Sequence, residues 1–400
     1  MTDYRREAEA MFDEIVGFRR TVHGYAELGL DTPRTAAFIE EKLRSFGIEP
    51  SRCGENGVVA VIGKGPDEGG EPGGKVLLLR ADTDALPMAE ATGLPYAAVN
   101  GNCHSCGHDL HAAMLLGAAK LLKVHESELK GRVKLMFQPG EEVLGGASDM
   151  IAHGLLEAPA VDAAIGMHVS SGGETSELGL VTFKRDYSTF SGDFVKVTVH
   201  GKQSHGSTPE NGVDAINIAA HIVTGLEELI SREVSNAERS VVLVGKIYGG
   251  DSCNTQAGTC VLEISVRAAS AERRSFLKQR IREISEGLAA AFRGSAETEY
   301  VYGQPPMYND ASMCDCVPGY AAEVVGEEKV RELFKFGGTE DFTAVAERVP
   351  SVYLHIGAGS IAGEGVTHHN PHIIFDERVL PLGAAVYANC AARYLEEHLA

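Results

Sequence analysis

Residues 76–87 read VLLLRADTDALP, a short apolar run that ends in acidic residues and is typical of a buried strand. Residues 102–124, NCHSCGHDLHAAMLLGAAKLLKV, predict a helix that begins behind a cluster of polar residues. Residues 133–142, VKLMFQPGEE, predict a second strand that again ends in acidic residues. A strand, a helix and a strand in this order favour a parallel sheet with helices packed on it.

The alternation continues on both sides of this stretch. We predict further strands at residues 57–62, 163–167 and 352–356, a helix that begins at Asp31-Thr32-Pro33, and a last helix at residues 376–398. The expected fold is therefore α/β, with a mixed, mostly parallel sheet covered by helices on both faces.

A segment with a different pattern interrupts the alternation near residue 184. Its predicted elements are, in order, a strand at 194–199, a helix at 213–230, strands at 241–247 and 261–266, and a helix at 271–292. This order predicts an inserted α+β domain of the ferredoxin-like kind. We therefore expect a catalytic domain made of residues 1–184 and 297–400, with a lid domain inserted at residues 185–296.

The composition excludes several classes of protein. The 400 residues are 44% apolar and 23% charged, which is typical of globular proteins rather than disordered or fibrous ones. Asp and Glu number 56 against 36 Lys and Arg, so the net charge is −20 at neutral pH. Such a chain repels nucleic-acid phosphates and anionic lipids, so we expect neither nucleic acid nor a membrane as a partner.

The sequence also bears on the compartment. Residues 1–20 mix acids and bases with scattered apolar residues and contain no uninterrupted apolar segment of the export type. The longest apolar stretch, residues 112–124, contains two lysines and is too short to span a bilayer. We therefore expect a cytoplasmic protein whose eight cysteines are thiols or metal ligands rather than disulfides.

Polar residues follow three of the predicted strands at the point where each strand ends. Asp82 and Asp84 follow one strand, Glu141 and Glu142 follow another, and His168 follows a third. Loops from the carboxyl ends of parallel strands converge at one edge of a sheet, where ligands bind. We therefore expect these side chains to lie close together.

The densest polar cluster is NCHSCGHDLH, residues 102–111. A borderline-soft divalent ion accepts thiolate, imidazole and carboxylate together, so this mixture favours a metal site. Cys106 and His108, two positions apart, can point the same way on an extended segment. Cys103 and Cys106 also have the spacing of a thiol redox pair, and the residues alone leave that alternative open.

Glu141 and Glu142 are expected to have different roles. Neighbouring residues in extended backbone point to opposite sides, so one carboxylate can bind a metal while the other carries a proton. Metal-assisted hydrolysis needs both roles. An isolated acidic pair is more often a solvated loop, and His168, His205 or His369, each taken alone, is more often structural.

Eight motifs in order resemble one family. They are RRTVHGYAELGL (19–30), LLLRADTDALP (77–87), NCHSCGHDLHAAMLLGAA (102–119), FQPGEE (137–142), GMHV (166–169), GKQSHGSTPENGVDA (201–215), GGTEDF (337–342) and HHNPHIIFDE (368–377). The chain resembles the aminoacylase and hippurate hydrolase group, which includes bacterial N-acyl-amino-acid amidohydrolases and plant auxin-conjugate hydrolases, among the carboxypeptidase-like metallopeptidases. The resemblance covers nearly the whole chain.

The resemblance implies a centre of two divalent ions, which would be zinc, manganese, cobalt or nickel. The implied ligands are Cys106, His108, Glu142, His168 and His369, with the Cys106 thiolate between the two ions. Glu141 would be the general base and then the acid that protonates the leaving amine. Asp82 and Asp109 would orient the ligand imidazoles.

The resemblance also assigns roles to the inserted domain, which in relatives often mediates dimerisation. His205 would stabilise the oxyanion, and Asn254 and Arg267 would hold the substrate carboxylate. The implied reaction is hydrolysis of an N-acyl or N-aroyl amino acid by a homodimer. Two alternatives remain: a dipeptidase or carboxypeptidase on the same scaffold, and a thiol redox or metal-binding protein that uses Cys103 and Cys106.

Overall fold

The structure is a computed structural model that describes residues 2–65, 69–70, 74–235, 238–333, 338–361, 363 and 365–399. The chain divides into two compact units. The first consists of Met1–Ser188, Tyr308–Lys335 and Asp341–Ala400, and the second of Thr189–Met307 and Phe336–Glu340. The chain of the first unit is thus interrupted by the second.

An eight-stranded sheet forms the centre of the first unit among the described residues, in the order β1-β2-β4-β3-β5-β16-β6-β15. Its strands are β1 (Pro50–Cys53), β2 (Gly57–Ile62), β3 (Val76–Asp82), β4 (Arg132–Gln138), β5 (Ala163–Ser170), β6 (Val181–Phe183), β15 (Val330–Glu332) and β16 (Ser351–Gly357). The central strands β4, β3, β5 and β16 are parallel, and β1 and β2 add antiparallel pairs at one edge. The predicted mixed, mostly parallel α/β sheet is confirmed.

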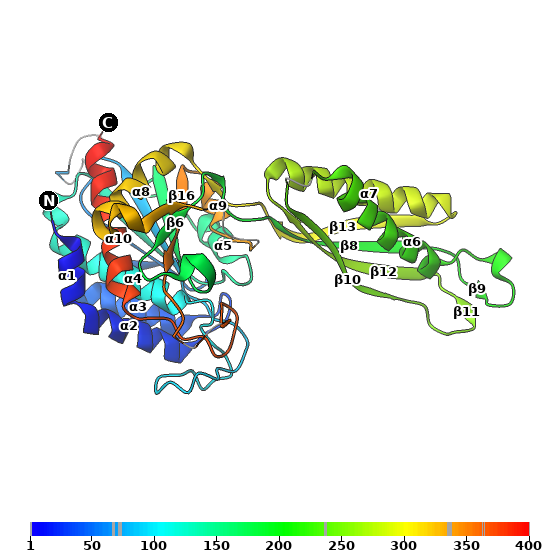
Figure 1. The fold of residues 1–400 in the computed structure, drawn as a ribbon, viewed down its shortest axis with the longest axis horizontal. Helices are drawn as coiled ribbons and strands as arrows, with labels where there is room; N and C mark the ends of the chain where they lie inside the picture. Colours follow the sequence, from blue (N-terminus) through cyan, green and yellow to red (C-terminus); the bar gives the residue numbers. More distant parts are fainter. Residues whose placement is uncertain are drawn as a thin grey trace. The chain divides into compact units, whose positions relative to one another are not determined.

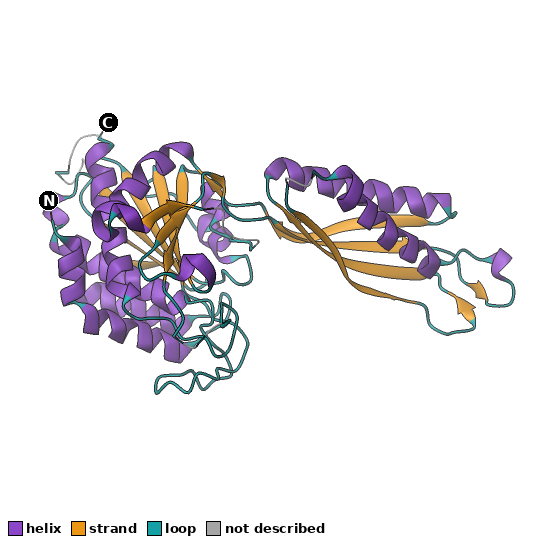
Figure 2. Ribbon diagram, in the orientation of Figure 1, coloured by secondary structure: helices purple, strands orange, loops and turns teal. Residues whose placement is uncertain are grey.

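Helices pack around this sheet (Figures 1 and 2). They are α1 (Tyr4–Ala10), α2 (Phe12–Tyr25), α3 (Pro33–Ser45), α4 (His108–Val124), α5 (Gly146–Ala152), α8 (Ala311–Val325), α9 (Thr343–Ala346) and α10 (Val379–Glu397). Helix α4 packs against both α2 and α10, and nearly all of its residues are buried. A side chain at Gly117 would come within 2.9 Å of the Ala384 Cβ atom, so α4 and α10 approach closely there. This packing holds the N-terminus of α4 against the sheet.

The second unit contains a four-stranded antiparallel sheet in the order β10-β12-β8-β13. Its main elements are β8 (Gly192–His200), α6 (Ala215–Glu228), β10 (Ser240–Gly249), β12 (Thr259–Ala268), α7 (Ala271–Ala291) and β13 (Ser295–Gln304). Helices α6 and α7 lie on the same face of the sheet (Figure 2). Val195, Val197 and Val199 of β8 are buried with the helix residues, and the residues between them face away, as period-two alternation requires.

The second unit extends farther along the chain than residue 296, where the sequence interpretation ended the inserted domain. It continues to Met307 because β13 pairs with β8 over most of its length. The sequence of β13, SAETEYVYGQ, alternates polar residues with small and aromatic ones, so its apolar pattern is weak. The unit begins at Thr189, close to the predicted boundary at residue 185.

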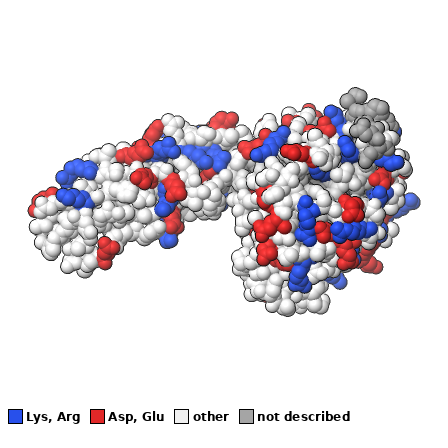
Figure 3. All heavy atoms as spheres, turned by 180° about the vertical axis from the view of Figure 1, so that it is seen from behind, with Lys and Arg blue, Asp and Glu red and all other residues white. Residues whose placement is uncertain are grey.

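Two short strand pairs lie outside these two sheets. One joins β7 (Asp186–Tyr187) to β14 (Tyr308–Asn309), and the other joins β9 (Ser204–His205) to β11 (Thr255–Gln256). Among the described helices, none combines the length and the hydropathy needed to cross a bilayer. On the face drawn in Figure 3, acidic and basic side chains are interspersed.

Candidate metal centre

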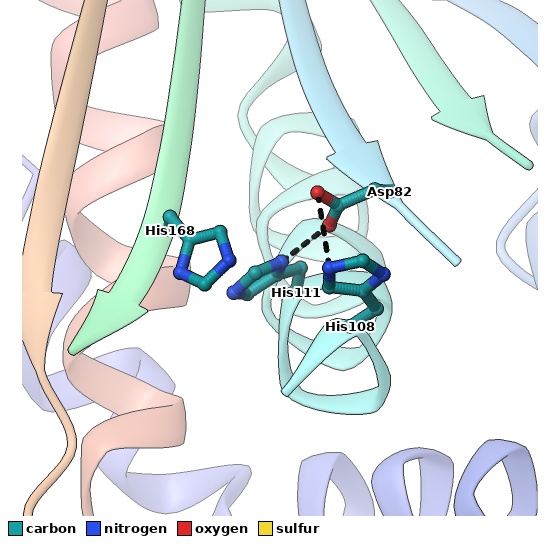
Figure 4. Close-up of side chains that lie close together, drawn as sticks. All are labelled: Asp82, His108, His111 and His168. Carbon is teal, nitrogen blue, oxygen red and sulfur yellow. Dashed lines mark hydrogen bonds and ion pairs between the residues drawn. The ribbon is translucent and has the colours of Figure 1, made fainter. Parts of the chain in front are cut away.

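The candidate site lies at the carboxyl ends of β3, β4 and β5, beside the N-terminus of α4. Asp82 is the last residue of β3, Glu141 and Glu142 follow β4, and His168 lies near the end of β5. Figure 4 shows Asp82, His108, His111 and His168 close together, with both helix histidines directed toward the strand ends. The polar residues after the strands therefore meet, as the parallel sheet requires.

The structure brings together the five residues that the family resemblance implies as ligands. One donor atom each from Cys106, His108 and Glu142 lies within 4.8 Å of the others. The Cys106 Sγ atom is 3.4 Å from Nε2 of His168, and Nε2 of His369 is 3.2 Å from Oε1 of Glu142. These side chains come from α4, the preceding loop, β5, the β4–α5 loop and the segment before α10.

Hydrogen bonds to the main chain set the direction of two of these histidines. His108 Nδ1 donates to the carbonyl oxygen of Asp84 at 2.9 Å, and His168 Nδ1 donates to that of Val169 at 2.6 Å. Because a carbonyl only accepts, each ring carries a proton on Nδ1, which leaves Nε2 as the nitrogen that a metal ion could bind. Nε2 of His108 is buried and has no hydrogen-bond partner among the described residues. The chemistry of this donor set therefore fits a metal ion.

The charges around the site favour a cation. Hydrogen bonds to Cys106 and Glu142 raise the pKa of His369 to about 10. Burial and the neighbouring His111 hold the pKa of His168 well below its usual range, so that this imidazole is neutral and able to bind a metal. The pKa of Glu142 is lowered despite burial, because His369 and His108 face it. Burial raises the pKa of the Cys106 thiol, so a divalent ion would displace the proton of this thiol as well as that of His369.

Glu141, the predicted proton carrier, is positioned by a residue to which the sequence gave no role. The Asp84 carboxylate accepts hydrogen bonds from the backbone N–H of Glu141 at 3.0 Å and from that of Glu142 at 3.1 Å. Glu141 is buried, and its Oε2 atom lies 3.9 Å from Nε2 of His108. Asp84 thus fixes the main chain that carries both neighbouring carboxylates. In the sequence, the position of Asp84 two residues after Asp82 at a strand end was the feature that could have indicated this role.

Asp82 and Asp109, both predicted to orient ligand imidazoles, differ in what they contact. Asp82 pairs with His111 and with Arg80 at 2.7 Å, and its Oδ2 atom lies 3.6 Å from Nε2 of His108. Asp109 instead accepts from Arg19 at 2.8 Å and pairs with His23 Nδ1 at 2.9 Å. Among the described residues, Asp109 bonds no ligand imidazole, because its side chain points toward α2 from the first turn of α4.

His111 lies within the cluster although the sequence assigned it no function. One donor atom from each of Asp82, His108, His111 and His168 falls within 4.8 Å of the others. The sequence feature that could have indicated this is the position of His111 three residues after His108, which places both on the same face of a helix. That spacing alone does not distinguish a ligand from a supporting residue.

The remaining predicted site residues belong to the second unit. His205 is exposed on β9 and bonds Ser207, and the N–H of Gly206 donates to the carbonyl of exposed Asn254 at 2.7 Å. Arg267 lies near the far end of β12, where it donates to the hydroxyl of Thr339. His205 and Asn254 are thus close together, and Arg267 is not part of that pair. Their roles toward a substrate stay predictions.

Comparison with known proteins gives consistent results. The sequence profile described as Peptidase family M20/M25/M40 matches residues 78–393. The chain is 35% identical to N-acetyl-L-cysteine deacetylase of Bacillus subtilis (strain 168), covering 96% of this chain and 89% of that protein. It is 33% identical to IAA-amino acid hydrolase ILR1-like 4 of Arabidopsis thaliana, covering 96% and 87%. A crystal structure of the Bacillus subtilis YXEP protein, described as a dinuclear metal binding peptidase from the M20 family, has a TM-score of 0.81, 29% identity and coverage of 97% and 99%.

Proposed function

Since this chain belongs to peptidase family M20/M25/M40, we propose that it hydrolyses the amide bond of N-acyl or N-aroyl amino acids, releasing a carboxylate and an amino acid. The observation that carries the proposal is the convergence of Cys106, His108, Glu142, His168 and His369 beside a second carboxylate, Glu141. The relatives' names, an N-acetyl-L-cysteine deacetylase and an IAA-amino acid hydrolase, support this substrate class.

Two divalent ions would be held by these five residues. The similar YXEP protein is described as dinuclear, which supports the number of ions. The donor set is compatible with zinc, manganese, cobalt or nickel. When bound, the ions would polarise the scissile carbonyl and lower the pKa of the attacking water.

Glu141 would move the proton during the reaction. Its carboxylate would take a proton from the attacking water and then deliver it to the nitrogen of the leaving amine. The Asp84 carboxylate holds the main chain of both Glu141 and Glu142, so the proton carrier and the ligand keep a fixed relation. Asp82 would support this arrangement through His111 and His108.

The second unit would contribute substrate contacts. The imidazole of His205 would stabilise the oxyanion, and Asn254 and Arg267 would hold the substrate carboxylate. His205 and Asn254 are exposed, so both side chains are accessible to a ligand. The resemblance stated above supports these roles, and we propose the second unit as a lid.

We also propose a homodimer formed through the second unit. Strand β10 lies at the edge of its sheet and exposes Val241, Leu243, Ile247 and Tyr248. A long, apolar edge strand presents unpaired backbone groups and favours pairing with another strand. A second copy of this chain would cover these residues. The other elements of the proposal are a cytoplasmic location and a small-molecule substrate, with neither nucleic acid nor a membrane as a partner.

A substrate panel tests the reaction. Purified protein is treated with a chelator, reloaded with zinc, manganese, cobalt or nickel, and assayed for amine release from N-acetyl amino acids, N-benzoyl amino acids and dipeptides. We expect hydrolysis of the N-acyl amino acids, lost on chelation and restored by metal. Cleavage of dipeptides alone would favour the dipeptidase alternative, and no cleavage by the loaded protein would contradict the proposal.

A pair of cysteine variants tests the thiol redox alternative. Burial raises the pKa of the Cys103 thiol to about 12, so this cysteine is protonated and a poor nucleophile at neutral pH. Cys103→Ser should therefore leave turnover nearly unchanged, whereas Cys106→Ala should lower the amount of bound metal. Activity that depends on Cys103 and survives the loss of Cys106 would support the redox alternative.

A further inference from the structure

A continuous line of buried hydrogen bonds runs behind the metal centre in the first unit. Arg80 donates to Asp341 at 3.2 Å and to Asp82 at 2.7 Å, and Asp82 in turn pairs with Nδ1 of His111. All four side chains are buried. The line then reaches β5, because the backbone N–H of Val169 donates to Nε2 of His111 at 2.9 Å.

The line ends at a predicted metal ligand. The carbonyl oxygen of Val169 accepts from Nδ1 of His168 at 2.6 Å, and Nε2 of that imidazole lies 3.4 Å from the Cys106 Sγ atom. His168 therefore takes its direction from a stretch of main chain whose N–H is fixed by His111. The contacts connect β3, α4 and β5 at the edge of the sheet where the site lies (Figure 4).

His111 has used both of its ring nitrogens in these contacts. An N–H donor requires a lone pair on Nε2, so that nitrogen carries no proton. Nδ1 faces a carboxylate and therefore carries the single ring proton. Ligation by Nε2 would break the bond to Val169, and ligation by Nδ1 would break the bond to Asp82. His111 therefore lies close to His108 and His168 without acting as a third imidazole ligand.

We propose that His111 is a positioning residue for the metal centre: a neutral imidazole that ties Asp82 to the main chain of β5 and so sets the direction of His168. This inference rests on the proposed function, in which His168 binds a metal ion. Supporting residues of this kind typically change metal affinity by about 10–100-fold when they are replaced. His111 acts through Val169 and Asp82 rather than on the substrate.

Cobalt titration of the full chain, from which bound metal has first been removed, tests the proposal. Binding is followed by the thiolate-to-cobalt absorption of Cys106 and by the d–d bands. His111→Leu removes both hydrogen bonds, so we expect cobalt affinity to fall about 10–100-fold and the d–d bands to shift, with two ions still bound at saturation. His111→Gln keeps one donor and one acceptor and should lose less affinity.

Met114→Leu is the matched control, since Met114 is buried on α4 one turn beyond His111 and has no part in the site. It should bind cobalt as the wild type does. If both His111 variants bind only one ion per chain at saturation, His111 is a ligand. If their cobalt affinity and spectrum are unchanged, His111 is a packing residue. Either result overturns the proposal. If His111→Leu does not fold, the stoichiometry and spectrum of His111→Gln decide. A wild-type chain that binds no cobalt would instead contradict the proposed function.

Discussion

At the scale of single residues, the main chain determines what the imidazoles of the site can do. His108 and His168 each donate from Nδ1 to a backbone carbonyl, whereas His111 accepts from a backbone N–H. The first two therefore leave Nε2 as the nitrogen that can bind a metal, whereas the Nε2 lone pair of His111 already accepts the N–H of Val169. The sequence indicated that His108 and His168 belong to the site but gave His111 no role, and the backbone contacts of these rings come from separate segments.

The acidic residues also gather as the sequence predicts, while their individual contacts were not predictable from it. Asp82, Asp84, Glu141 and Glu142 were predicted to meet because they follow parallel strands, and they do. Sequence reasoning alone did not show that Asp84 would anchor the Glu141–Glu142 backbone. The direction of Asp109 toward Arg19 and His23 was equally hidden, because the partners lie on a helix that is far away in the sequence.

Replacing Glu141 tests its role as proton carrier. Glu141→Gln keeps the size of the side chain and removes its ability to take a proton, so we expect kcat to fall by at least about 100-fold. Metal content, measured by elemental analysis, should stay at the wild-type value. Loss of metal together with activity would place Glu141 among the ligands instead.

Gly107 separates two predicted ligands and has a backbone that only glycine adopts easily. Its φ angle is +92°, and a Cβ atom there would lie 2.5 Å from Cγ2 of Val169. Gly107→Ala should therefore move Cys106 relative to His108 and lower the affinity for metal, as measured by cobalt titration.

Gly287 provides the matched control for that substitution. It lies within α7 of the second unit, and a side chain there would meet nothing within 4 Å. Gly287→Ala should bind metal normally and gain about 0.5–1 kcal/mol of stability. Equal metal affinities in the two alanine variants would contradict the role assigned to Gly107.

At the scale of elements, α2 holds the start of α4 in place. Arg19 and His23 of α2 both contact the Asp109 carboxylate, and the other ring nitrogen of His23 pairs with Glu90 at 3.0 Å. Although burial opposes it, the hydrogen bonds to Asp109 and Glu90 raise the pKa of His23 from 6.5 to about 9. His23 is therefore protonated at neutral pH and links the two helices as a cation.

This link predicts a pH-dependent stability. Because the pKa of His23 is higher in the folded protein than in the unfolded chain, its contribution is complete below pH 6.5 and is lost as the pH rises through about 9. The free energy of unfolding lost in His23→Gln should thus be about 3 kcal/mol larger at pH 6 than at pH 9.5. Urea unfolding of both proteins at the two pH values measures this difference. A loss that is the same at both values would show that His23 is not charged in the folded state.

The elements themselves were predictable to different degrees. The buried helix α4 and the parallel strands were clear in the sequence because they are continuous apolar runs, buried at nearly every position. Strand β13 was not, because it lies at a sheet edge and exposes Glu297, Glu299, Val301 and Tyr302. Its pairing with β8, rather than its composition, defines it as part of the second unit.

At the scale of the whole molecule, the proposed dimer is tested by adding a charge to the edge strand. Leu243 of β10 is 57% exposed and would be covered by a second copy. Leu243→Glu should therefore shift the protein from dimer to monomer in sedimentation velocity. Ala290→Glu adds the same charge to an exposed position of α7, on the helix-covered face, and should remain dimeric. A wild-type monomer, or a Leu243→Glu dimer of undiminished affinity, would contradict the interface.

The central claim is that five side chains from separate segments bind two metal ions beside Glu141. Anomalous diffraction from crystals of the metal-loaded protein, collected at the absorption edge of the bound metal, tests it most directly. We predict two peaks within bonding distance of Cys106, His108, Glu142, His168 and His369, with the Cys106 sulfur between them and His111 bound to neither. A single peak, or peaks coordinated by other residues, would contradict the account.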